Sequence, residues 1–91
     1  MELFTIVLDW LDLETLMWQG EGACAKSAVE KWASEVSLSE VPGLSAEGLL
    51  ELQKELKAED AAPIRGWSNT WCMAPLVGDE LALFHIVQTV R

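Results

Sequence analysis

The chain has 91 residues, of which 51% are hydrophobic and 23% charged, and its formal net charge is −9. This composition excludes an intrinsically disordered chain, and the length predicts a single domain over residues 1–91. Because nucleic-acid binding requires Lys and Arg to neutralise phosphates, six scattered cations against fifteen acidic residues argue against DNA or RNA as a partner.

The N-terminal residues and the cysteines indicate the compartment. The first residues lack the positive n-region of a secretory signal peptide, and the first apolar run is broken by Asp9 and Asp12. No stretch reaches the roughly 20 apolar residues of a membrane span. Two cysteines, Cys24 and Cys72, do not make a disulfide framework. We therefore expect a cytoplasmic protein with reduced thiols and no membrane partner.

The first part of the chain predicts two strands and a helix. Residues 2–10 are centred on an apolar run that predicts a strand, and residues 15–19 predict a second strand that ends at the following glycines. Because few residues separate the two strands, they must pair antiparallel. Ser27 and Glu30 have the spacing of a capping box, and the apolar positions that follow recur at helical spacing. These features predict a helix over residues 27–36.

The remainder predicts a second helix and two further strands. Ser45 has the character of an N-cap, and the leucines after it recur at i, i+3 and i+7, which predicts a helix. Residues 67–73 predict the third strand and residues 80–90 the fourth, separated by a turn at Gly78-Asp79.

The order strand, strand, helix, helix, strand, strand predicts an α+β fold. We expect a four-stranded, mostly antiparallel sheet with both helices packed on one face. The first and last strands are the most apolar, so they should lie at the centre of the sheet and pair with each other. The other two strands should form the edges.

Over residues 3–36, the order strand, turn, strand and a helix that opens with Ser27-Ala28-Val29-Glu30 resembles the start of HicB-type antitoxins. The proline-glycine segment that those proteins carry before their helix is absent, and so is a DNA-binding tail. The resemblance therefore implies a shared architecture and transfers no site residues.

The face of the sheet without helices predicts a partner surface. Two short helices cover one face, and an uncovered apolar face would exceed the few hundred Å² that monomers usually tolerate. We therefore expect a homodimer, because closed two-fold dimers are the commonest assemblies. Tryptophans on edge strands would add anchoring area beside free backbone groups. The predicted interface residues are Leu3, Val7, Leu16, Trp18, Trp67, Trp71 and His85.

The acidic residues suggest a metal-dependent alternative. Asp9, Asp12 and Glu14 cluster at the first corner, and a helical acid, Glu30 or Glu35, could join Asp9 in a minimal metal-dependent hydrolase. The corner lacks the glycine and ligand spacing of a calcium loop, and a solvated hairpin corner accounts for its charges.

The soft metal ligands are few, since Cys24, Cys72 and His85 lie far apart in sequence and lack the short-range pairs of a zinc site. We therefore expect no metal, no cofactor and no catalytic residue. The sequence predicts a small, acidic, non-catalytic protein-binding domain that forms a homodimer. Besides the hydrolase, the alternative is an inhibitor of immunity or antitoxin type, whose acidity would match a basic partner protein.

Overall fold

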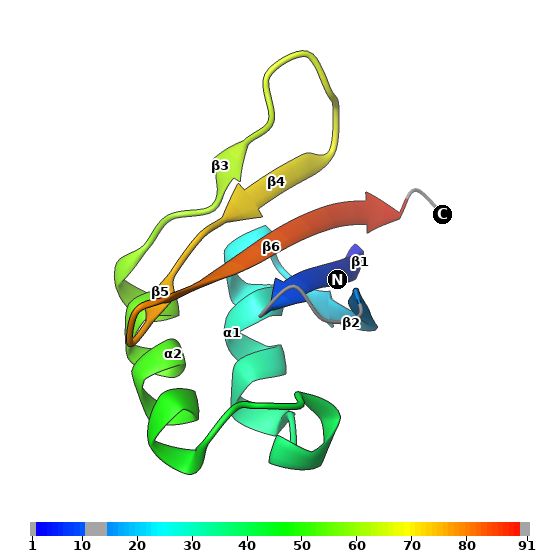
Figure 1. The fold of residues 1–91 in the computed structure, drawn as a ribbon. Helices are drawn as coiled ribbons and strands as arrows, with labels where there is room; N and C mark the ends of the chain where they lie inside the picture. Colours follow the sequence, from blue (N-terminus) through cyan, green and yellow to red (C-terminus); the bar gives the residue numbers. More distant parts are fainter. Residues whose placement is uncertain (1, 11–14, 90–91) are drawn as a thin grey trace.

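The structure is a computed structural model that describes residues 2–10 and 15–89. Figure 1 shows its elements in chain order. They are β1 (Glu2–Trp10), β2 (Leu16–Gly22), α1 (Ala25–Glu35), the 3-10 helix η1 (Leu38–Glu40), α2 (Ala46–Ala58), β3 (Ala62–Pro63), β4 (Thr70–Met73), β5 (Leu76–Val77) and β6 (Glu80–Thr89).

The strands form an antiparallel sheet in the order β2-β1-β6-β4-β3, with β5 paired to β6 beside this path. The predicted α+β class is confirmed, and β1 and β6 pair with each other at the centre as expected. The predicted number of four strands is wrong in detail. β3 and β5 have only two residues each, which is too short to show an alternating pattern in the sequence.

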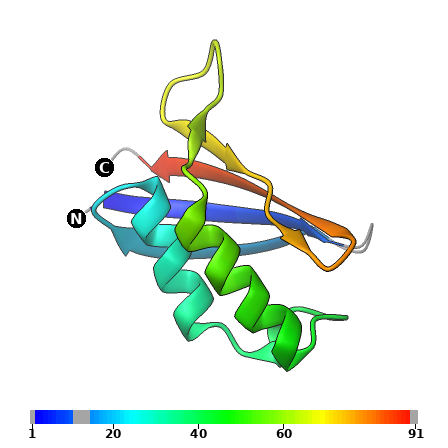
Figure 2. The same ribbon diagram turned by 90° about the vertical axis from the view of Figure 1, so that its left-hand side faces the viewer.

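Both helices lie on one face of the sheet (Figure 2). Helix α1 packs on β1, β2 and β6, while α2 packs on α1 and β5. The buried side chains form one apolar cluster between these layers. Its largest contributions are Phe4, Ile6, Leu8 and Trp10 from β1, Phe84 and Ile86 from β6, Val29 and Trp32 from α1, and Leu52 and Leu56 from α2.

The start predicted from the sequence is correct for α2 and wrong for α1. Ser45 is the N-cap of α2, as predicted, and its Oγ accepts a hydrogen bond of 2.9 Å from the Gly48 N–H. Helix α1 begins earlier than predicted, with Cys24 as its N-cap. Ser27 instead occupies the third helical position, and its Oγ accepts a hydrogen bond of 3.0 Å from the Cys24 N–H. The predicted N-cap at Ser27 is therefore wrong: this residue supplies the returning half of a capping box.

Glu51 of α2 and Glu59, the C-cap residue of that helix, fix the connection from β4 to β6. Glu59 accepts a hydrogen bond of 2.7 Å from the Ala74 N–H, and Glu51 accepts one of 2.8 Å from the Gly78 N–H. A charged acceptor strengthens such bonds. They hold α2 beside β5 although Glu51 and Glu55 form a like-charge i,i+4 pair on the helix.

The third predicted strand is shorter than expected. Residues 67–73 suggested a strand, but β4 contains only Thr70–Met73. Asn69 has a φ of 59°, in the left-handed region, which interrupts an extended backbone. Trp67 therefore belongs to the segment 64–69, which joins β3 to β4 and projects beyond the sheet (Figure 1). None of the helices in the described part of the chain is long and apolar enough to cross a membrane.

Candidate functional site

The face of the sheet opposite the helices is called the open face below. Along β1 and β6, residues buried under the helices alternate with residues that are partly or fully exposed. Paired residues of neighbouring strands share a face, so the ladders extend this assignment across the sheet. The open face consists of Leu3, Thr5, Val7 and Asp9 on β1, Met17, Gln19 and Glu21 on β2, Leu81, Leu83, His85, Val87 and Thr89 on β6, and Thr70 and Cys72 on β4.

The open face carries large apolar side chains in contact with solvent. Met17 is 66% exposed, Leu81 is 50% exposed and Val87 is 40% exposed. Of the described residues on this face, only Asp9 and Glu21 carry a formal charge, and they lie at opposite ends of it, paired with Leu83 and Leu3. The middle of the face therefore combines apolar residues with polar ones, among them Thr5 and Gln19, and its described residues include no Asp, Glu, Lys or Arg.

One row of the open face crosses four strands. Val7 of β1 pairs with Met17 of β2 on one side and with His85 of β6 on the other, and His85 in turn pairs with Cys72 of β4. These four residues, named here the central row, lie on a line perpendicular to the strands. The row combines two apolar residues with the imidazole and thiol of neighbouring strands.

The structure divides the predicted interface residues between the two faces. Leu3, Val7 and His85 lie on the open face. Leu16 and Trp18 lie on the helix-covered face, because they pair with the buried residues of β1. The expectation that these residues share a face with Leu3 and Val7 is wrong. Successive strand residues alternate between faces, so an error of one position in the phase of β2 moves all of its side chains to the other side.

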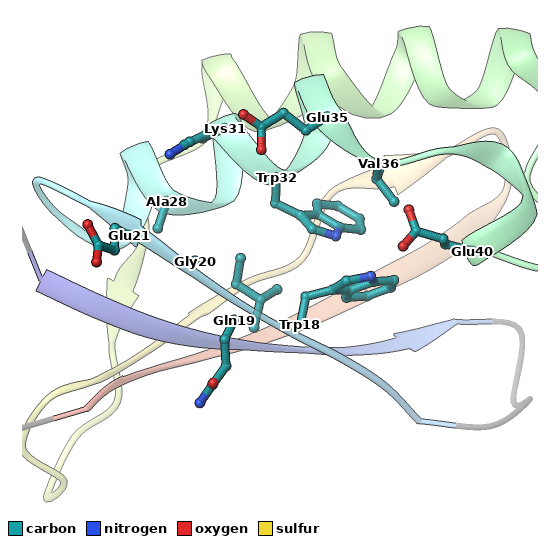
Figure 3. Close-up of a pocket in the computed structure, with 11 residues that line it drawn as sticks. Trp18, Gln19, Gly20, Glu21, Ala28, Lys31, Trp32, Glu35, Val36 and Glu40 are labelled. Carbon is teal, nitrogen blue, oxygen red and sulfur yellow. The ribbon is translucent and has the colours of Figure 1, made fainter.

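Trp18 forms part of a pocket between β2 and α1 (Figure 3). Its ring centroid lies 4.8 Å from that of Trp32, with an angle of 52° between the planes. The pocket has a volume of about 230 Å³, and Lys31, Glu35 and Glu40 are among the residues at its rim. The Trp32 Nε1–H finds no hydrogen-bond partner among the described residues. Since β2 is an edge strand, the pocket lies at the outer edge of the sheet.

The other two predicted tryptophans differ in exposure. Trp71 lies on the helix-covered face, where its ring packs edge-on against Phe4 with a centroid distance of 5.9 Å. Trp67 is 72% exposed in the projecting segment 64–69. Neither residue belongs to the open face, so the structure does not gather the predicted tryptophans into one surface.

The predicted acidic cluster does not converge in the described part of the chain. Asp9 lies on the open face, where its Oδ1 accepts a hydrogen bond of 3.0 Å from the Thr15 hydroxyl. Glu30 and Glu35 belong to α1, on the other side of the sheet. Within residues 2–10 and 15–89, no three His, Cys, Asp or Glu side chains are placed to hold a metal ion. Asp12 and Glu14 lie outside the described residues.

The two cysteines are free thiols in different surroundings. Cys24 is exposed at the N-terminus of α1, and a hydrogen bond with the Ser27 hydroxyl, at 3.5 Å from Sγ, lowers the pKa of its thiol below the ordinary value. Cys72 is partly buried beside His85. Sequence spacing alone missed this pair because its members belong to different strands.

Comparison with known proteins adds no family to these observations. The chain matches no family model, and no curated protein or solved structure has significant similarity to it.

Proposed function

We propose that this chain is a non-catalytic protein-binding domain that forms a homodimer through its open face. The observation that carries the proposal is the set of exposed large apolar side chains, Met17, Leu81 and Val87, on a face of the sheet that has no helices and few charged residues. Removing such a surface from water is favourable by about 25 cal/mol per Å². A second copy offers the same surface, which is the requirement for a two-fold interface.

The size of the open face supports a weak, specific dimer. At about 3.3 Å per residue and about 4.8 Å between strands, the four main strands cover roughly 500 Å². Two such faces would bury about 1,000 Å², near the lower limit for a specific interface. We therefore expect a dimer that dissociates on dilution.

The charge distribution also favours this arrangement over association through the helices. Each chain carries a net charge of −9, so two copies repel each other. The helices expose several carboxylates, among them Glu35, Glu47 and Glu55. The middle of the open face has none among its described residues, so contact through this face keeps the acidic helices of the two copies apart.

Light scattering over a dilution series, with two matched variants, tests the proposal. The wild-type mass should approach twice the 10.1 kDa of one chain at high concentration and fall on dilution. Val7→Asp places a carboxylate in the central row and should give a monomer. Leu50→Asp, at a leucine 67% exposed on α2, should leave the dimer intact. A wild-type mass of one chain at the highest concentration would refute the homodimer.

A second candidate is an inhibitor of immunity or antitoxin type, which the net charge of −9 favours. In a dimer joined through the open faces, the acidic helices would point outward and could attract a basic partner protein. A gene next to this one that encodes a basic toxin, and loss of that toxin's activity on mixing with this chain at low salt, would support this function. Neutralisation that does not weaken as the salt concentration rises would contradict the electrostatic basis of the idea.

A further inference from the structure

Cys72 and His85 form a pair of soft metal ligands on the open face. They are directly opposite each other on β4 and β6. Side chains at such positions have Cβ atoms about 4.5–5.5 Å apart and stand roughly perpendicular to the sheet. Both residues are partly exposed, so a thiolate and an imidazole nitrogen can point to the same place above the sheet.

We propose that two copies of this pair hold one zinc ion at the two-fold axis of the homodimer. The inference rests on the proposed function, because one copy supplies only two ligands. If the axis runs along the central row, each residue of that row faces its own equivalent in the second copy. The Cys72–His85 pair of one copy then faces the same pair of the other, which completes four ligands of the kinds that tetrahedral zinc sites use.

The spacing between packed sheets suits such an ion. Two sheets stacked face to face lie about 10 Å apart, so the midplane is about 5 Å from each. Zinc bonds to sulfur at about 2.3 Å and to imidazole nitrogen at about 2.0–2.1 Å. A cysteine and a histidine side chain directed away from the sheet span the remaining distance. An ion at the midplane is therefore within reach of both copies.

The charge of the site matches its surroundings. Binding releases one proton from each Cys72 thiol to solvent, and the two thiolates balance the charge of Zn²⁺ while both imidazoles remain neutral. The complete centre carries no net charge, which suits an apolar interface. Of the two charged residues described on this face, Glu21 lies at the far end, paired with Leu3, and Asp9 lies diagonally from His85, paired with Leu83.

The same argument explains why a single copy lacks a complete site. The described residues of one chain contain no cluster of three or more potential ligands. A site built from two half-sites predicts one metal ion per two chains. It also predicts that metal strengthens a dimer whose apolar area is near the lower limit for a specific interface.

Titration with Co²⁺ tests the inference, because the visible absorption of the ion reports tetrahedral thiolate ligation. The buffer contains a phosphine reductant that keeps the thiols reduced. The expected end point is one Co²⁺ per two wild-type chains, with the absorption lost on addition of Zn²⁺. Cys72→Ala and His85→Ala should each remove the tetrahedral signal. Cys24→Ala is the matched control, because Cys24 lies at the N-terminus of α1 and should leave the signal unchanged. Circular dichroism checks that each variant is folded.

Light scattering of the same samples, with Zn²⁺ or with a chelator, measures the oligomeric state. It distinguishes failure of the zinc site from failure of the proposed homodimer. A dimer in both conditions with no half-stoichiometric metal binding would overturn the zinc site and leave the proposed function standing. A monomer in both conditions would overturn both. In a parallel sample without the phosphine, a dimer that forms only there, through a Cys72–Cys72 disulfide, would also overturn the zinc site. The zinc site is supported if one ion binds per two chains and the dimer persists to lower protein concentrations with Zn²⁺ than with the chelator.

Discussion

Trp32 of α1 packs between an edge strand and the sheet centre, with its ring centroid 4.8 Å from Trp18 and 5.3 Å from Phe84. The residue is 7% exposed, so its ring forms much of the contact between helix and sheet. Replacing it by alanine removes this contact and leaves a cavity.

We expect Trp32→Ala to lower the free energy of unfolding by about 3–5 kcal/mol. Trp67→Ala is the matched control, because that tryptophan is 72% exposed and its loss should change stability by no more than about 0.5 kcal/mol. Denaturant unfolding of both variants measures the difference. Equal effects would mean that the helix does not pack through Trp32.

Helix α1 also approaches β2 closely at a glycine. A Cβ at Gly22 would lie 2.9 Å from the Ala28 backbone nitrogen and 3.0 Å from its Cα. Backbone atoms cannot move aside cheaply, so Gly22→Ala should cost about 1–3 kcal/mol of stability. Gly20→Ala is the control, since no described atom beyond its chain neighbours lies within 4 Å of the added methyl group. If both variants unfold at the same denaturant concentration, the backbone of Ala28 does not lie as close to Gly22 as the structure places it.

The central strands should be the most stable part of the chain. Residues Phe4–Leu8 pair with strands on both sides, and Ala82–Ile86 pair with β1 along their whole length and with β4 from Phe84 onward. Both segments also contribute to the apolar cluster. Such segments exchange only through global opening. Hydrogen exchange followed by NMR should show these amides as the slowest. Exchange in Ala82–Ile86 as fast as in the segment 64–69 would contradict the sheet order.

Cys24 should react at a lower pH than an ordinary thiol. The hydrogen bond between the Cys24 Sγ and the Ser27 hydroxyl lowers the pKa of the Cys24 thiol, which increases the fraction of reactive thiolate at neutral pH. In a Cys72→Ala background, the pH midpoint of alkylation by iodoacetamide should lie below that of a free cysteine. Ser27→Ala should move the midpoint to higher pH. A midpoint that does not move would show that Ser27 does not act on the thiol.

The sequence allowed prediction of the central strands but not of the phase of β2. Residues 81–87 form a mostly apolar run that predicts a strand, and the similar apolar character of residues 4–8 predicts its pairing with β1. In β2, Leu16, Met17 and Trp18 are consecutive apolar residues, so the pattern assigns neither phase. Only the register with β1, in which Val7 faces Met17, places Trp18 under α1.

The sequence also did not allow prediction that Cys72 and His85 lie opposite each other. Its formation depends on the register of β4 with β6. That register follows from the connection through Pro75 and β5, where the Pro75 carbonyl accepts a hydrogen bond of 2.9 Å from the Ala82 N–H. No local pattern in the sequence encodes this arrangement. The exposure of Trp67 likewise follows from the left-handed backbone at Asn69.

The central claim, that two copies meet through their open faces, is tested most directly by NMR on a mixture of isotope-labelled and unlabelled chains. Isotope-filtered spectra detect only contacts between the two kinds of chain. The account predicts contacts from the methyl groups of Val7, Leu83 and Val87 on the open face, and none from Leu50 on α2. Contacts from Leu50 without any from the open face, or no contacts from the open face at a concentration where the mass is that of two chains, would contradict it.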